Sequence, residues 1–80
     1  MNTQERNFRF LLEYISSRLI EFLMRDQAIG LEEALLTLHN SETFEKLSDI
    51  NTGLYIESPE FNYLLLNEEF SRGTLRGLSE

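Results

Sequence analysis

Apolar residues recur at helical spacing through the first third of the chain, and no glycine or proline interrupts them. The residues in this pattern are Phe8, Leu11, Leu12, Ile15, Leu19, Phe22 and Leu23. At about 100° per residue they form a stripe roughly 120° wide, which is typical of a helix that packs one side against a core. We therefore predict one long helix over residues 3–26.

Four further apolar residues of this helix lie off the stripe. They are Phe10, Tyr14, Ile20 and Met24. Either the other helices wrap around this one and bury them, or they form an exposed patch that binds a second chain; the pattern leaves both interpretations open. Because aromatic residues and methionine are enriched at protein interfaces, these four residues are the candidate interaction surface. A homodimer, or a complex with another protein, is the assembly we expect from them.

A short helix is predicted over residues 31–39, after Gly30 has broken the first pattern. One face of this helix carries Leu31, Ala34, Leu35 and Leu38. Asn40 and Ser41 are residue types that end one helix and cap the next. A second short helix follows over residues 42–49.

The inward residues of this second short helix are Phe44 and Leu47. A turn rich in Asp, Asn and Gly comes next, over residues 49–53. The three residues after it, Leu54 to Ile56, are expected to be extended.

The last helix is predicted over residues 59–72. Ser58 is a preferred N-cap residue and Pro59 suits the first helical position. This helix is apolar on two sides: Phe61, Leu64, Leu65 and Glu68 share one, and Tyr63, Leu66 and Phe70 share the other. Gly73 is a candidate C-cap, and residues 1–4 and 74–80 are expected to be frayed.

Together these elements predict a single small all-α domain over residues 1–80, with four helices. The long first helix and the last helix should pack antiparallel or crossed, and the two short helices should close the core. The expected core is Phe8, Leu12, Ile15, Leu19, Phe22, Leu31, Leu35, Leu38, Phe44, Leu47, Tyr55, Phe61, Leu64 and Leu65.

Charge and size narrow the range of partners. The 80-residue chain has a net charge of −7, and residues 31–60 carry seven acidic residues against Lys46 alone. Such a chain repels phosphate backbones and anionic membrane surfaces, so we expect neither nucleic acid nor membrane as a partner. The N-terminus lacks the basic-then-apolar order of a secretory signal, which favours a cytoplasmic location. A domain this small is only marginally stable alone, and oligomerisation is one way to stabilise it.

Candidate chemistry is sparse. His39 is the only histidine and there is no cysteine, so neither a catalytic triad nor a zinc site is indicated. The adjacent carboxylates Glu32/Glu33 and Glu68/Glu69 point about 100° apart on a helix and do not converge. No glycine-rich phosphate loop is present. The sequence therefore predicts no catalytic residue, no cofactor and no enzyme activity.

The run from residue 49 to residue 60 admits one metal hypothesis. It has the length of a calcium-binding EF-hand loop, and Asp49, Asn51 and Glu60 fit ligand positions 1, 3 and 12. Gly53 removes the ligand at position 5, however, and Leu54 stands where the sharp turn needs glycine. A plain turn followed by a helix cap is the preferred interpretation, and calcium binding is the alternative.

Three stretches of the chain carry a family resemblance: Leu31-Glu32-Glu33-Ala34-Leu35, Phe44-Glu45-Lys46-Leu47 and Thr52-Gly53-Leu54-Tyr55-Ile56-Glu57-Ser58-Pro59-Glu60-Phe61. With these, residues 10–70 resemble a family of small uncharacterised bacterial helical proteins. Some members of that family are similar to proteins suspected of toxin–antitoxin association. The Thr-Gly-Leu-Tyr and Ser-Pro elements are structural, so no functional residue carries over.

The function expected from all of this is a small non-enzymatic protein-interaction or regulatory module that self-associates. Two alternatives stand beside it. One is a calcium-responsive module built on residues 49–60, and the other, implied by the resemblance, is an antitoxin-like protein that binds a partner.

Overall fold

The computed structural model describes residues 3–72, and within them the chain is helical. The α-helices are α1 (Thr3–Gln27), α2 (Leu31–His39), α3 (Glu42–Leu47) and α4 (Pro59–Arg72). Two 3₁₀ turns, η1 (Ile50–Thr52) and η2 (Leu54–Ile56), join α3 to α4. The described residues contain no strand. The predicted all-α fold with a long first helix and four α-helices is confirmed.

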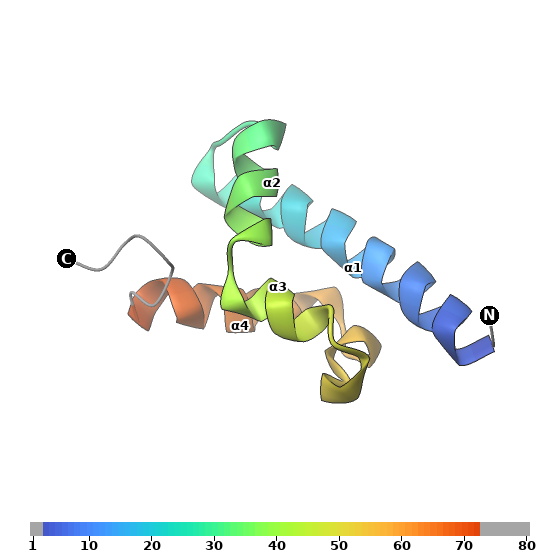
Figure 1. Ribbon diagram of the computed structural model, residues 1–80. Helices are drawn as coiled ribbons and strands as arrows, with labels where there is room; N and C mark the ends of the chain where they lie inside the picture. The colour runs from blue at the N-terminus through green and yellow to red at the C-terminus, as the bar shows by residue number, and fades with distance from the viewer. Residues whose placement is uncertain (1–2, 73–80) are drawn as a thin grey trace.

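The long helix α1 sets the shape of the molecule. Its 25 residues extend about 37 Å, and the longest dimension of the fold is 43 Å. In Figure 1, α2 folds back at the end of α1, α3 lies in front of α4, and η1 and η2 turn the chain between them. α1 contacts α2, α4 and η2, so these three elements all pack against this one rod.

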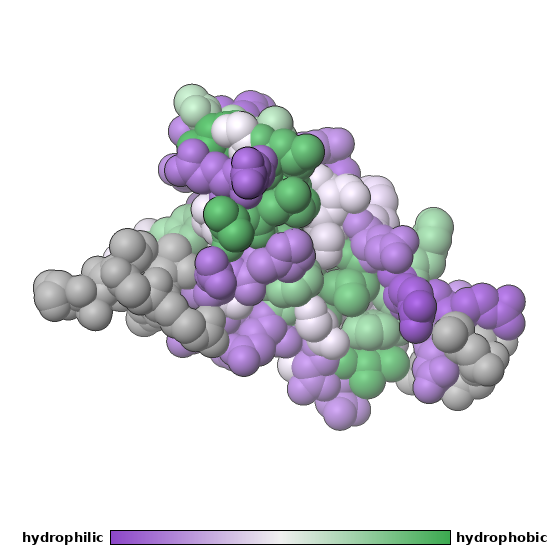
Figure 2. Space-filling view, turned by 45° about the horizontal axis from the view of Figure 1, so that its top comes forward, coloured by the Kyte–Doolittle hydropathy of each residue, from purple (hydrophilic) through white to green (hydrophobic). Residues whose placement is uncertain are grey.

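Helix α2 turns a narrow side toward the core. Ala34 and Leu38 are fully buried, whereas Leu31 is 57% and Leu36 60% exposed. Figure 2 shows hydrophobic side chains gathered on the surface over α2. The expectation that Leu31 lies in the core is therefore wrong. Leu31 occupies the first turn of α2, at the end of the molecule where the chain reverses after α1 (Figure 1).

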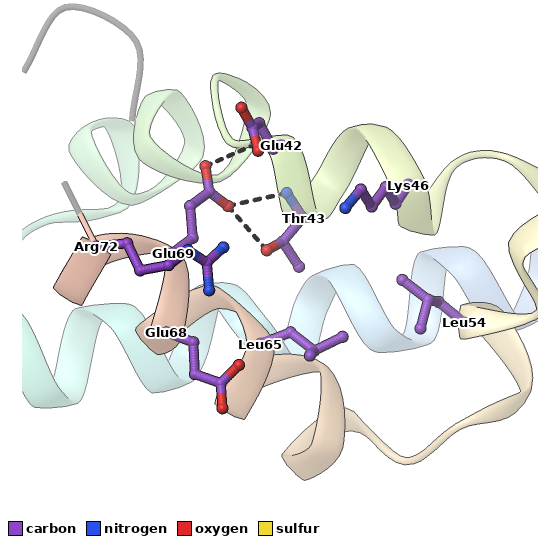
Figure 3. Close-up of a pocket in the computed structure, with 8 residues that line it drawn as sticks. All are labelled: Glu42, Thr43, Lys46, Leu54, Leu65, Glu68, Glu69 and Arg72. Atoms are coloured by element: carbon purple, nitrogen blue, oxygen red, sulfur yellow. Dashed lines mark hydrogen bonds between the residues drawn. The ribbon is translucent and has the colours of Figure 1, made fainter. Parts of the chain in front are cut away.

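The first turn of α3 is capped by two side chains. Ser41 Oγ accepts a hydrogen bond from the Phe44 amide at 3.0 Å. The Glu69 carboxylate reaches across from α4 and accepts from the Glu42 amide at 2.8 Å, the Thr43 amide at 2.9 Å and the Thr43 hydroxyl at 2.8 Å (Figure 3). Helix ends leave backbone N–H groups without partners, and anions are favoured at the N-terminus. Glu69 thus joins α4 to α3 by pairing groups that α3 cannot satisfy alone.

A second polar side chain of α4 holds the turn before it. Asn62 is fully buried, and its Nδ2 donates to the carbonyl oxygens of Leu54 and Ser58, both at 3.1 Å. Ser58 Oγ in turn accepts from the Phe61 amide at 3.0 Å, which confirms the predicted N-cap. Asn62 therefore fixes η2 against the first turn of α4.

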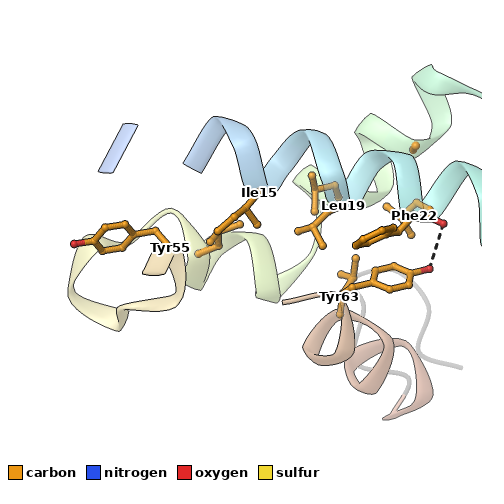
Figure 4. Packing of buried hydrophobic residues seen from close by; sticks show 10 residues of the cluster. Ile15, Leu19, Phe22, Tyr55 and Tyr63 are labelled. Atoms are coloured by element: carbon orange, nitrogen blue, oxygen red, sulfur yellow. Dashed lines mark hydrogen bonds between the residues drawn. The ribbon is translucent and has the colours of Figure 1, made fainter. Parts of the chain in front are cut away.

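Buried apolar residues from α1, α2, α3, η2 and α4 form one core. Its members are Ile15, Leu19, Phe22, Leu23, Ala34, Leu38, Leu47, Tyr55, Tyr63 and Leu66. Tyr55 lies at one end of this core and Tyr63 at the other (Figure 4). Tyr55 meets the half-buried Phe8 edge-to-face with ring centroids 4.9 Å apart. Of the remaining expected core residues, four are also only half-buried: Leu12, Leu35, Phe44 and Leu65.

The side of α4 that faces the core is not the one expected from the sequence. Phe61 is 41% and Leu64 54% exposed, although both were expected in the core. Tyr63 and Leu66, from the other apolar side, are buried in their place. Both sides are apolar, so the hydrophobic pattern does not choose between them. The buried polar residues Asn62 and Glu69 share the side of Leu66, and their hydrogen bonds select it.

Three local expectations also differ from the structure. Residues 54–56 form the 3₁₀ turn η2 instead of an extended segment, because Gly53 adopts a left-handed conformation with φ of 73° and its carbonyl accepts a hydrogen bond from the Ile56 amide. Helix α3 ends at Leu47, two residues before the predicted limit. Helix α1 already begins at Thr3, inside the segment expected to be frayed. Residues 1–2, the candidate cap Gly73 and residues 74–80 lie outside the described residues.

The end of α1 is closed by a residue in an unfavourable conformation. Ala28 has φ of 56°, in the left-handed region where a Cβ atom costs about 1–2 kcal/mol and where glycine is usual after a helix. Gly30, which breaks the helical pattern in the sequence, has φ of −83° and serves as the N-cap of α2.

Replacing Glu69 by glutamine tests the cap on α3. Glu69→Gln should lower the free energy of unfolding by about 1–3 kcal/mol, because an amide NH₂ group would face backbone N–H donors that a carboxylate oxygen now satisfies. Chemical denaturation followed by circular dichroism measures the change. Glu68→Gln is the matched control, since Glu68 is exposed on the same helix and should shift stability by less than about 0.5 kcal/mol. Equal effects of the two variants would contradict the cap.

Ala28→Gly should stabilise the fold by about 0.5–1 kcal/mol. The substitution removes the cost of a Cβ atom in the left-handed conformation, and part of that gain is offset because glycine increases the conformational entropy of the unfolded chain. Gly53→Ala should act in the opposite sense, because Gly53 holds a positive φ. Thermal melts of the two variants against the parent chain check both signs, and a melting temperature lowered by Ala28→Gly would rule out the strained turn.

Candidate functional site

The structure divides the four candidate interaction residues into two pairs. Phe10 is 70% and Tyr14 50% exposed. Ile20 and Met24 are half-buried and pack against the core. The wrapping interpretation therefore describes Ile20 and Met24, and the exposed-patch interpretation describes Phe10 and Tyr14.

The exposed side of α1 continues from Tyr14 into a row of charge. Arg18 follows Tyr14 by four residues and Arg25 follows by eleven, so at about 100° per residue all three lie within roughly 40° of one another around the helix. Phe10 lies one turn before Tyr14, about 40° further round. One side of α1 thus carries two exposed aromatic rings and then two guanidinium groups.

Where α1 meets the start of α4, this row borders a shallow hollow, which we call the α1–α4 groove. Arg18, Phe22, Arg25, Glu60 and Tyr63 line it, and its volume is about 330 Å³. The rings of Phe22 and Tyr63 lie side by side with centroids 5.0 Å apart (Figure 4). The guanidinium carbons of Arg18 and Arg25 lie 4.9 Å and 5.1 Å from the Phe22 ring centre, within the range of cation–π attraction.

Each arginine of the groove also pairs with a neighbour on its own helix. Arg18 Nη1 lies 2.8 Å from a Glu21 oxygen, and Arg25 Nε lies 2.9 Å from an Asp26 oxygen. The hydrogen bond from Arg25 lowers the pKa of Asp26 and raises that of Arg25. All four side chains are at least a third exposed, so these pairs contribute little to stability and exchange readily for others.

Tyr63 forms the floor of the groove in its neutral form. Burial of the phenol, together with its hydrogen bond to Asp26, raises its pKa to about 12. The Phe22 carbonyl oxygen lies 3.5 Å from the same hydroxyl, as a second and weaker acceptor for its one proton. The phenol is therefore a structural group at neutral pH and does not act as a base there.

A second hollow lies between α3 and α4, with a volume of about 250 Å³ (Figure 3). Its lining mixes acidic residues with Lys46 and Arg72. The Glu69 carboxylate is committed to the end of α3, because both of its oxygens accept hydrogen bonds. His39 packs edge-on against Phe44, with ring centroids 4.7 Å apart. The Thr43 hydroxyl donates to Glu69 at 2.8 Å, but both side chains are buried and serve the cap of α3.

The loop that prompted the calcium hypothesis folds into the turns η1 and η2. Asp49 Oδ1 accepts a hydrogen bond from the Asn51 amide at 3.0 Å, while Glu60 lines the α1–α4 groove on α4. Within residues 3–72, no three or more His, Cys, Asp or Glu side chains come together in a way that would hold a metal ion.

Comparisons with known proteins assign no family to the chain. No family model matches it, and neither a curated protein nor a solved structure does. The resemblance to small bacterial helical proteins stays an expectation. None of the helices in the described part of the chain combines the length and the apolar character needed to cross a membrane.

The sequence analysis did not single out the α1–α4 groove. Arg18 and Arg25 had no part in the expected interaction surface. The signal was present, since Arg18, Phe22 and Arg25 are spaced by four and three residues and so lie near one another on a helix. The opposite wall could not be foreseen, because the side of α4 that carries Phe61 was expected to face the core and the side that carries Tyr63 was not.

The raised pKa of Tyr63 predicts a loss of stability at high pH. The folded pKa of about 12 exceeds the usual value of 10, so the stabilisation is complete below pH 10 and is lost as the pH rises from 10 toward 12. Urea denaturation at pH 8, 10 and 11 should show this decline, and Tyr63→Phe should flatten it. Tyr14→Phe, at a half-exposed tyrosine, is the control and should leave the decline unchanged.

Proposed function

We propose that this protein is a small non-enzymatic interaction module that associates with a second copy of itself through the exposed side of α1. The observation that carries the proposal is the exposure of Phe10 and Tyr14, 70% and 50%, on a regular helix. Large aromatic side chains held rigidly at the surface are typical of interface anchors, because they bury much area on binding and lose little conformational entropy.

The architecture supports this reading of α1. The side chains of residues 5–14 are half-buried or exposed, and full burial begins only at Ile15. The N-terminal part of α1 thus extends beyond the core, where it is accessible to another chain. A chain of 80 residues has little core to stabilise it, and association adds buried apolar area.

The alternatives gain no comparable support. Within the described residues no three His, Cys, Asp or Glu side chains gather as metal ligands, so the calcium-responsive module gains no support from them. The antitoxin-like alternative depends on the resemblance alone. The exposed leucines of α2, Leu31 and Leu36, are a second apolar area, and the experiment below is arranged to discriminate between it and α1.

Phe10→Glu combined with Tyr14→Glu should weaken self-association at least about tenfold, because the loss of aromatic anchors from an interface costs more than about 1.4 kcal/mol. Light scattering over a concentration series measures the mass. Leu31→Glu with Leu36→Glu is the matched control: it adds the same two negative charges at exposed apolar positions on α2, 57% and 60% exposed, and should leave the mass unchanged. A dimer broken by this α2 variant alone would move the surface to α2, and a parent chain that is monomeric at every concentration would contradict the proposed function.

A further inference from the structure

The N-terminal arm of α1, residues 5–14, carries a regular row of residues on the side that faces away from the core. With the next turn, this row consists of Asn7, Phe10, Tyr14 and Ser17, spaced by three, four and three residues. That is the spacing of the a and d positions of a coiled coil, where one helix packs such a seam against a second helix. All four side chains are exposed, and the arm forms one end of the molecule (Figure 1). The seam is therefore open to another helix.

Opposite charges occupy one flank of this seam. Arg6 and Glu13 are seven residues apart, so only about 20° separates them around the helix, and both take the g position of the heptad. Both side chains are exposed, and within residues 3–72 neither forms a salt bridge. This flank therefore offers one free cation and one free anion to a second chain.

The order of the two charges selects one arrangement of two such helices. In an antiparallel pair, the g positions of one helix face those of the other. When Asn7 lies opposite Phe10 of a second copy, Arg6 faces Glu13 of that copy, and the two-fold axis makes the same contact a second time. A shift of one helix by a heptad would instead place Glu13 against Glu13, where like charges repel. The charges therefore favour the first register.

The distribution of net charge favours the same arrangement. The chain has a net charge of −7, and residues 31–60 carry seven acidic residues against Lys46 alone. The arm, by contrast, holds two glutamates and two arginines, so two copies repel each other least when they meet through their arms. Full burial begins only at Ile15, and an antiparallel pair of arms therefore keeps the two cores at opposite ends. A parallel pair would hold the two acidic bodies level with each other.

We propose that two copies of this chain associate through an antiparallel pair of their α1 arms, in which Arg6 of each copy pairs with Glu13 of the other. This inference rests on the proposed function, because it gives the orientation and register of the same self-association. Phe10 and Tyr14 then pack against the first turns of the second helix. Because the arm has only about three turns, the interface lies at the small end of the range for specific complexes and the dimer dissociates readily. Added salt weakens it.

Charge reversal tests this pairing on the full chain. Arg6→Glu and Glu13→Arg each create two contacts between like charges, so either variant alone should raise the dissociation constant about tenfold in sedimentation equilibrium. Two rescues are then expected. A one-to-one mixture of the variants should form a heterodimer, and the double variant Arg6→Glu with Glu13→Arg should associate as tightly as the parent chain. In both, each altered side chain again meets an opposite charge, and the rescue also shows that the variants fold.

Two control variants change the net charge by the same amounts. Arg9→Glu matches Arg6→Glu, and Glu32→Arg matches Glu13→Arg. Both control positions are exposed. Arg9 lies about 100° around α1 from Phe10, beyond the flank of the seam, and Glu32 belongs to α2. Each control should alter the dissociation constant by less than about twofold.

A spin label reports the orientation of the two helices. The chain has no cysteine, so Ser17→Cys supplies a single attachment point at an exposed position. In the proposed register the two labelled residues lie about 25 Å apart along the helix pair. A distance of about 25 Å or more by electron paramagnetic resonance supports this register. A distance of about 15 Å or less would overturn it, because a parallel pair, or a shift by one heptad, brings the labels closer.

The outcomes separate the arm pairing from the proposed function. A parent dimer that neither charge reversal weakens would overturn the pairing and leave self-association standing. Weakening of both variants without rescue in the mixture would overturn the direct contact between Arg6 and Glu13. A parent chain that stays monomeric at every concentration would overturn both the pairing and the proposed function.

Discussion

The contact on which the rest of this fold depends is the Glu69 carboxylate at the first turn of α3. Helix α3 has only six residues, and an isolated helix of that length is unstable in water. Glu69 and Ser41 satisfy the amides of its first turn, so α3 is stabilised by contacts from outside itself. The same bonds hold α4 beside α3, which in turn positions η1 and η2 between the two helices.

That contact also determines which part of α4 reaches solvent. With Glu69 and Asn62 both buried, α4 can turn only one of its two apolar sides inward. Tyr63 then meets Phe22 and closes the floor of the α1–α4 groove, while Phe61 and Leu64 face outward. A structural hydrogen bond at one end of α4 thus sets the chemistry of the surface at the other end.

Hydrophobic periodicity was sufficient to predict the bounds of α2 and α4 and to place α1 within one residue, because glycine, serine and proline mark their ends. It was not sufficient to predict which side of α4 faces the core, since both sides of that helix are apolar. The contacts that decide it are the hydrogen bonds of Glu69 to α3, which join residues 26 and 27 positions apart. The same limit applies to the candidate site. Phe10 and Tyr14 were identified from α1 alone, whereas the α1–α4 groove requires knowledge of what α4 presents to α1.

Because the N-terminal part of α1 extends beyond the core, the helical order of this segment is coupled to the binding of another chain. Through residues 5–14 the helix has only the half-buried Phe8, Leu11 and Leu12 on the rest of the fold, so its backbone amides there open to hydrogen exchange at lower free energy than those around Leu19. Any chain that covers this segment stabilises the helical form selectively. Fraying of the first turns and dissociation of a bound chain are then linked equilibria, and each shifts the other by the same free energy.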